Sequence, residues 1–369
     1  MSTLVFSHPG NNQLDLTSSE DVRAVHFVGS LPAAMTGDHR QMMQWFLDHA
    51  PNTTALTGLP CDPDPRWVID WLDGLATIDA LEPVRTGHSA DYDDMPTYRL
   101  KHGHWLESDD LSLGRAAHTA AVMAARAQLH DDRDFPPHQV SIPNPYDLAL
   151  FTFGSPAAAV THLPVFRQAV LDDVHTIHQW YGNQVVFQLE TPAVLATLDR
   201  TPRPLWPAAV RALAKQVTRV LIDGPREATW RIHLCHGDLG HQPLFALTDL
   251  VPAVQFLNAL HKQLHRLRIP MPAVHIPMCT GTQAPPTDPR FYRALRHLRR
   301  DIDVIAGLVD ETHPKDSHVA LGLVETELDR PVLAVAAACG HGRRLVPDAV
   351  ANAALACELA HHTTDTPAR

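Results

Sequence analysis

Eight short apolar segments recur along the 369-residue chain, separated by longer segments with helical spacing. Strands that are apolar along their whole length are typical of parallel sheets, because helices cover both faces of such sheets. Eight units of this kind favour an α/β fold of the (β/α)8 TIM-barrel type over an open sheet. The expected strands cover residues 24–29, 53–58, 139–142, 184–190, 230–235, 272–277, 304–309 and 332–337.

The interval between the second and third expected strands is too long for a single helix. It holds a polar stretch over 86–110, rich in His, Tyr and Asp, and then a helix near 113–129. We expect this long insertion to lie over the barrel mouth and to govern substrate size. Helical spacing also predicts helices over 207–221, 249–267 and 346–360. Since no internal repeat is present, we expect an N-terminal extension over 1–20 and one catalytic domain over 21–369.

Composition narrows the class of protein. Hydrophobic residues make up 45% of the chain, which is enough for a large core and excludes global disorder. The net charge of −11 argues against nucleic acid or an anionic membrane as a partner. No apolar run is long enough to span a membrane, and no signal peptide is recognisable. The five cysteines are too scattered for a compact disulfide framework, so we expect a reduced, cytoplasmic protein.

Two distant segments carry candidate metal ligands. In His233-Leu234-Cys235 the imidazole and the thiol share one face of an extended segment, because side chains alternate along a strand. Cys339 follows the last expected strand, and the carboxyl ends of barrel strands converge. Three such ligands would leave the fourth position of a tetrahedral Zn²⁺ site open for a substrate. The alternative is a buried apolar cysteine beside a core histidine.

Other polar side chains near the expected strand ends are candidates for substrate contacts or proton transfer. His236 and Asp310 are candidate acid/base groups, although both could be ordinary loop residues. Asp238 is expected to orient a histidine ligand or contact the substrate. Asn144 is expected to line the pocket, and Arg343 to bind an acidic group of the substrate.

The chain resembles the C-terminal catalytic barrel of cobalamin-independent methionine synthase and its single-barrel relatives in the uroporphyrinogen decarboxylase/methionine synthase-like superfamily. Four motifs carry the resemblance and occur in the family's order over most of residues 22–360. They are the Gly29-Ser30 turn before Pro32, the run Gln188-Leu189-Glu190-Thr191-Pro192-Ala193, the pair His233 and Cys235, and Cys339-Gly340 followed by basic residues.

The resemblance implies roles at the matching positions. His233, Cys235 and Cys339 would ligate zinc, which would activate a substrate thiol as a zinc-bound thiolate. Ser30 and the backbone around Gly29 would hold a substrate carboxylate, because a hydroxyl and free amides suit an anion. Glu190 would stand where the family has an Asp that binds the substrate amino group, and it is also a candidate catalytic residue.

The sequence departs from the family at several of its functional positions. The sixth expected strand lacks the acidic zinc ligand, so His275 or Cys279 could substitute, or water or substrate could occupy that position. The second strand lacks the family's substrate-binding Glu, for which Asp62 is a poor match. The half of the full-length synthase that helps to bind folate has no counterpart here, which weakens the case for homocysteine and polyglutamyl folate.

These observations favour a zinc-dependent methyl- or alkyltransferase acting on a small-molecule thiol. The methyl or alkyl donor could be a folate, a corrinoid protein or a small metabolite. Three alternatives remain open. They are addition of a thiol to an epoxide or other electrophile, as in coenzyme M transferases, a degenerate barrel that binds a small molecule without turnover, and a zinc hydrolase or lyase.

Overall fold

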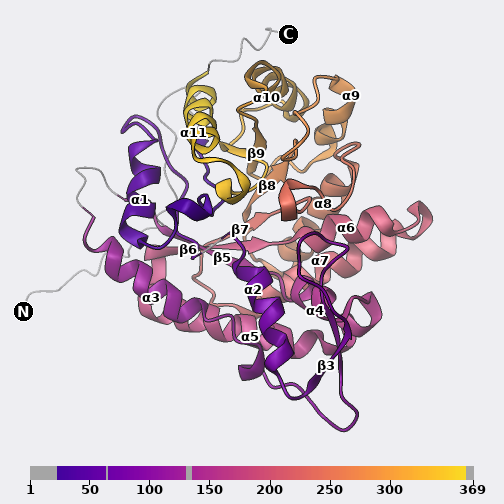
Figure 1. The fold of residues 1–369 in the computed structure, drawn as a ribbon. Coiled ribbons are helices and arrows are strands. Elements are labelled where there is room, and N and C mark those ends of the chain that lie inside the picture. Colours follow the sequence, from indigo (N-terminus) through magenta and orange to yellow (C-terminus); the bar gives the residue numbers. More distant parts are fainter. Residues whose placement is uncertain (1–22, 64, 130–134, 363–369) are drawn as a thin grey trace, which may run out of the picture.

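The computed structural model describes residues 23–63, 65–129 and 135–362, so the predicted N-terminal extension over 1–20 lies outside the described residues. The main feature is a curled sheet of eight parallel strands with helices arranged around it (Figure 1). The fold is TIM-like, as the sequence predicts. The strands follow the order β1-β10-β9-β8-β7-β6-β5-β2. Their bounds are β1 Ala24–Val25, β2 Leu59–Pro60, β5 His138–Pro143, β6 Val185–Glu190, β7 Trp230–His233, β8 Ala273–Pro277, β9 Val304–Val309 and β10 Ala334–Ala337.

The predicted strands from the third to the eighth are confirmed to within two residues at each end. The first is shorter than predicted, because only Ala24–Val25 pairs with β10. The second is wrong: residues 53–58 are not a strand, and β2 lies just after them. Within this segment Leu56 forms an isolated parallel bridge with Val25. The Val25 amide donates to the Ala55 carbonyl at 2.8 Å, so β1 is joined to the segment that leads into β2.

Eleven α-helices lie within the described residues, and most connect consecutive strands. The predicted helices over 207–221, 249–267 and 346–360 correspond to α7, α8 and α11. No described helix is long and apolar enough to cross a membrane. The helices are α1 His39–Asp48, α2 Trp67–Gly74, α3 Arg115–Arg126, α4 Pro145–Phe153, α5 Pro156–Tyr181, α6 Pro192–Arg200, α7 Trp206–Asp223, α8 Val251–Leu267, α9 Pro289–Tyr292, α10 Pro314–Leu328 and α11 Val346–His361.

The connection from β2 to β5 has more structure than the sequence predicts. It holds α2, an antiparallel hairpin of β3 (Leu81–Arg85) and β4 (Thr97–Leu100), and α3. Part of the stretch 86–110 is therefore strand β4 rather than irregular chain. The Tyr92 hydroxyl accepts hydrogen bonds from the backbone amides of Asp238 and Leu239 at 2.9 and 3.0 Å. This stretch therefore reaches the segment that follows β7.

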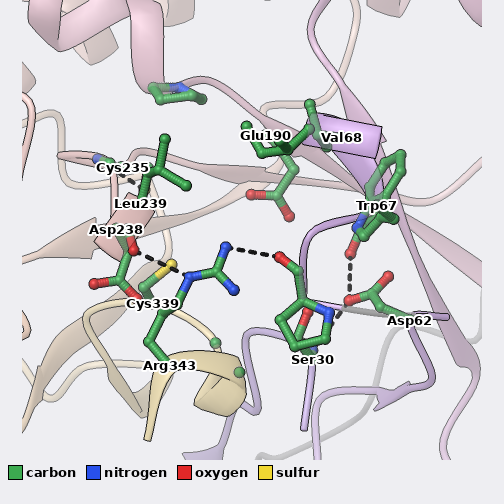
Figure 2. Close-up of a pocket in the computed structure, with 18 of the residues that line it drawn as sticks. Ser30, Asp62, Trp67, Val68, Glu190, Cys235, Asp238, Leu239, Cys339 and Arg343 are labelled. Atoms are coloured by element: carbon green, nitrogen blue, oxygen red, sulfur yellow. Dashed lines mark hydrogen bonds between the residues drawn. The ribbon is translucent and has the colours of Figure 1, made fainter. Parts of the chain in front are cut away.

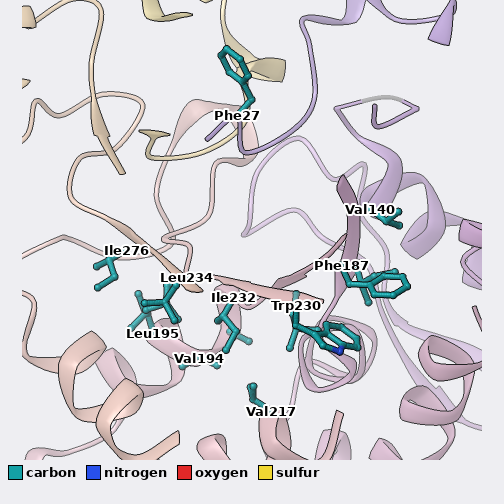
Figure 3. Close-up of a cluster of buried hydrophobic side chains, with 14 of the residues drawn as sticks. Phe27, Val140, Phe187, Val194, Leu195, Val217, Trp230, Ile232, Leu234 and Ile276 are labelled. Carbon is teal, nitrogen blue, oxygen red and sulfur yellow. The ribbon is translucent and has the colours of Figure 1, made fainter. Parts of the chain in front are cut away.

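Along β5, β6, β7 and β8, side chains alternate between an apolar outer face and an inner face that carries polar groups, whereas β9 and β10 are apolar on both faces. Ile232 on the outer face of β7 and Leu234 just past its end belong to the main cluster of buried apolar side chains, together with Val194 of α6 and Val217 of α7 (Figure 3). Burial of this face against the helices supplies most of the favourable free energy of folding.

The inner face makes hydrogen bonds across the sheet. Gln188 of β6 donates through Nε2 to the Val28 carbonyl at 2.6 Å. Gln139 of β5 donates to the same carbonyl at 2.9 Å. Arg231 of β7 donates to the carbonyl of Thr57. These bonds connect the long strands to the ends of the two shortest ones.

A buried ion pair fixes the start of β1. Arg23 donates through Nε and Nη2 to the two carboxylate oxygens of Glu325 on α10, and through Nη1 to the His362 carbonyl. The side chains are only 1% and 6% exposed. Glu325 also accepts from the Val332 amide at 3.1 Å. One carboxylate therefore holds β1, α10 and the chain before β10 together.

We predict that Arg23→Ala lowers the free energy of unfolding by about 3–5 kcal/mol, because it leaves the Glu325 carboxylate buried without its cation. The matched control is Arg300→Ala, which removes an ion pair with Asp329 whose side chains are 77% and 74% exposed. That variant should stay within about 0.5 kcal/mol of the wild type. Urea unfolding of the three proteins measures both effects. Equal losses in the two variants would contradict the prediction.

Candidate metal centre and adjoining cavity

The three candidate metal ligands come together at the carboxyl ends of β7 and β10. His233 ends β7, Cys235 lies two residues further on, and Cys339 lies two residues past the end of β10. One ligand atom from each of them lies within 4.8 Å of the other two. His233 and Cys235 are buried, whereas Cys339 is partly exposed. Figure 2 shows Cys235 and Cys339 beside the cavity described below.

The His233 imidazole is suited to bind a metal ion. Its side chain is 1% exposed, and neither ring nitrogen has a hydrogen-bond partner. Burial, together with the neighbouring His275, holds the pKa of His233 well below its usual value. The ring is therefore neutral, which is the form that binds metal ions. A buried polar group without a partner calls for an explanation, and a role as a metal ligand would supply one.

The two thiols complete a donor set typical of zinc. The hydrogen bond between the Cys235 and Cys339 side chains raises the pKa of Cys235, and burial raises it further. The Gly237 amide donates to Cys235 Sγ at 3.2 Å. One imidazole and two thiols are a known ligand set for catalytic zinc, with one position left for water or substrate. The residues present therefore fit the implied ion.

The two candidates for a further ligand, His275 and Cys279, lie outside this group. His275 Nε2 donates to the Ala337 carbonyl at 2.9 Å, and its ring stacks on His233 with 4.5 Å between centroids. The Cys279 thiol donates to the Gly307 carbonyl at 3.5 Å. His275 thus supports the orientation of the His233 ring, and Cys279 is engaged elsewhere.

A cavity of about 210 Å³ adjoins the two thiols. Cys235, Cys339 and most of the residues expected to bind substrate line this cavity (Figure 2). Its polar lining comes from Ser30, Asp62, Ser141, Glu190, Asp238 and Arg343.

Glu190 lies at the end of β6 with its carboxyl group between the cavity and His233. One oxygen accepts from Gln188 Nε2 at 2.7 Å, and the other lies 3.5 Å from His233 Nε2. Burial raises the pKa of Glu190 to about 8, against the opposing effect of the Gln188 hydrogen bond. The structure therefore places Glu190 where it can contact both the ligand group and a bound substrate.

The Gly29-Ser30 turn already faces a carboxylate of the protein. The Ser30 amide donates to Asp62 Oδ2 at 3.1 Å. A Cβ atom at Gly29 would lie 2.5 Å from the same oxygen, and the φ angle of Gly29 is +151°. Glycine is therefore required for this close approach. The Ser30 amide, which we expected to bind a substrate carboxylate, thus binds the carboxylate of Asp62.

Asp62 and Arg115 form a buried pair at this wall that we did not expect. Arg115 Nη2 donates to Asp62 Oδ1 at 3.3 Å, and the side chains are 2% and 4% exposed. The Arg115 guanidinium also lies 4.4 Å from the ring centroid of Trp67. No sequence signal distinguishes Arg115 from a solvent-exposed arginine at the start of an amphipathic helix.

Arg343 and Asp238 line the opposite wall, and both bind within the protein. Arg343 donates through Nε to the Asp238 carbonyl at 3.3 Å and through Nη2 to the Pro65 carbonyl at 2.9 Å. The Asp238 carboxylate lies 3.3 Å from His241 Nδ1, and this contact raises the pKa of His241. Among the histidines, Asp238 therefore orients His241 rather than a candidate ligand.

Three of the residues predicted to bind substrate or to transfer a proton do not line this cavity. His236 points to the other side of the strand end from Cys235, because successive side chains alternate, and packs on Phe245. Asn144 donates to Asp147 at the start of α4. Asp310 accepts from Thr312 and His313 within a turn.

The sequence carries no distinct signal for two aromatic residues of the lining. Trp67 and Trp71 lie four residues apart, which is equally typical of a helix face that packs on a core. The structure places both in the lining of the cavity. Spacing alone cannot distinguish a helix face that covers a core from one that covers a cavity.

No protein-family model matches the chain, and no curated protein matches its sequence. Solved structures do match it. A B12-independent methionine synthase from Shewanella sp. W3-18-1, in complex with selenomethionine, has a TM-score of 0.54 and 12% identity, over 92% of this chain and 97% of that one. A methyltransferase from Methanosarcina mazei has a TM-score of 0.55 and 9% identity, over 93% and 94%. The structural neighbours are thus cobalamin-independent methionine synthase and related methyltransferases, and at these identities the chain shares their fold.

Proposed function

We propose that the protein is a zinc-dependent methyl- or alkyltransferase that acts on a small thiol. One observation carries the proposal: His233, Cys235 and Cys339 converge within 4.8 Å beside a cavity, and the His233 ring has no hydrogen-bond partner. The fold shared with the methionine synthase and the methyltransferase supports the reaction class.

Zinc held by these side chains would lower the pKa of a substrate thiol, so that the sulfur is a nucleophile at neutral pH. The side chains that line the cavity would bind and orient the two reactants. The cavity positions the thiol and the electrophilic carbon of a donor next to each other, which supplies much of the rate. The sulfur–carbon bond forms as the bond from that carbon to its leaving group breaks, and the leaving group keeps the electron pair. Glu190 positions a hydrogen-bond donor of the substrate.

The volume of the cavity limits the size of the substrates. A cavity of about 210 Å³ is smaller than the roughly 300–1,000 Å³ typical of sites for drug-sized ligands, which favours small substrates.

We propose that residues 21–369 act as one catalytic domain and that the β2–β5 connection is the insertion that shapes the cavity. All five cysteines are free thiols, which fits a reducing environment such as the cytoplasm.

Metal content tests the ligand set directly. Protein purified without chelator should hold about one zinc per chain, and Cys235→Ala should hold almost none, because two remaining ligands bind weakly. Cys357→Ala is the matched control, since Cys357 is a buried cysteine of α11 outside the group. It should keep its zinc. Elemental analysis of the three proteins decides the matter, and a wild type that takes up no zinc when zinc is offered contradicts the proposal.

Zinc should also stabilise the folded protein. At a free zinc concentration 100 times Kd, binding to the native state adds about 2.7 kcal/mol, so thermal unfolding of metal-free protein should shift upward when zinc is added. His233→Ala should abolish most of this shift. His265→Ala, which changes an exposed histidine of α8, should keep it. Differential scanning calorimetry measures the shift, and an equal zinc response in both variants would exclude His233 as a ligand.

A further inference from the structure

The cavity beside the candidate ligands has a large apolar wall that the proposed function does not use. α2 supplies most of it, and the chain before β4 and α4 supply the rest. Figure 2 shows Trp67 and Val68 across the cavity from Cys235 and Cys339. The main apolar side chains are Trp67, Val68, Trp71, Tyr92, Met95 and Phe151.

This wall adjoins the thiols through Tyr92. The Tyr92 hydroxyl binds the amides of Asp238 and Leu239, and a Cβ atom at Gly237 would lie 2.4 Å from that hydroxyl. The ring is therefore packed against the turn that follows Cys235. An apolar surface therefore begins next to the candidate ligands, along which a substrate with its sulfur at those ligands would extend its body.

The charges in the lining disfavour an anionic substrate. Three carboxyl groups line the cavity, those of Asp62, Glu190 and Asp238. Arg343 is the one arginine or lysine among the described lining residues, and two of its nitrogens already donate to backbone carbonyls. The cation that pairs with Asp62 is Arg115, which is not part of the lining. Among the described lining residues, a substrate carboxylate would therefore meet no arginine or lysine that is free of protein partners.

We propose that the thiol that binds in this cavity is uncharged and carries an apolar aliphatic or aromatic body. This inference rests on the proposed function, because it places the substrate sulfur at His233, Cys235 and Cys339. It goes further by excluding thiols that depend on a carboxylate for recognition.

The test titrates cobalt-substituted protein with a series of thiols and follows the visible absorption of the metal, which changes when a new sulfur ligand binds. From ethane-1-thiol to pentane-1-thiol, each methylene should tighten binding about fourfold, as apolar burial predicts. Butane-1-thiol should bind at least about tenfold more tightly than 3-mercaptopropanoate, which has similar length and a carboxylate.

A charge-placing variant sharpens the test. Val68→Lys puts a cation on the apolar wall and should tighten binding of 3-mercaptopropanoate while weakening that of pentane-1-thiol. The matched control is Val160→Lys on α5, where the valine is 54% exposed and lies outside the cavity lining. It should behave as the wild type. The cobalt spectrum without thiol shows that the ligand group is intact in each variant, and Val68→Asn provides a milder change of the same wall.

The outcomes separate the two proposals. If thiols change the cobalt spectrum but affinity is independent of chain length, or 3-mercaptopropanoate binds more tightly in the wild type, the apolar class is wrong and thiol binding at the metal stands. If cobalt binds and no thiol changes its spectrum, thiol activation fails, and the inference fails with it.

Discussion

Hydrogen bonds from the inner face of the sheet hold its two weakest strands. β1 and β2 are two residues long, so few ladder bonds fix them. Gln139 and Gln188 bind the Val28 carbonyl just past β1, and Arg231 binds the Thr57 carbonyl just before β2. Buried polar groups must be paired, so the inner side chains constrain the ends of both strands. The Gly29-Ser30 turn and Asp62 follow directly from those ends.

The same constraint positions the candidate metal ligands relative to the first strand. Cys339 is followed by Gly340, where a Cβ atom would lie 2.8 Å from the Gly29 carbonyl oxygen. The His341 amide then donates to the Ser30 carbonyl at 3.0 Å. The end of β10 is thus packed against the end of β1. His233 is held from its other side by the stacked ring of His275, so the ligands come from well-supported strand ends. Support of this kind is what a metal site requires of its scaffold.

The polar and apolar walls of the cavity have separate structural origins. The ends of the sheet strands bring Glu190, Cys235 and Cys339. The connection from β2 to β5 brings the aromatic wall, including Trp67 and Tyr92. The candidate site residues thus lie on the scaffold shared with the solved structures, whereas the connection shapes the space around them. Loops and connections that vary over a constant barrel are the usual way in which this architecture changes its substrate.

The amino-acid sequence alone predicts a parallel sheet and the face of a strand on which each side chain lies. Hydrophobic runs such as 304–309 are dictated by burial on both faces, and a period of two places His233 and Cys235 on one face whatever surrounds them. The same period excludes His236 from the cavity, although its position next to Cys235 made it a candidate. Local hydrogen bonds also engage the side chains of Asn144 and Asp310, with Asp147 and Thr312 as their partners.

The groups that face the candidate ligands from distant parts of the chain are placed there by tertiary packing. The Asp62 carboxylate accepts from the Ser30 amide and pairs with Arg115. The Arg115 guanidinium in turn lies against the Trp67 ring. These contacts join residues far apart in the sequence, so the local sequence pattern does not predict them. The strand near 53–58 was misplaced for a related reason, since pairing of so short a segment depends on its partners rather than on its own composition. The spacing of apolar residues shows which face of a helix or strand is buried, because side chains on one face recur with the period of the backbone. Which groups meet there depends on how distant elements pack, and the chain settles that only when it folds.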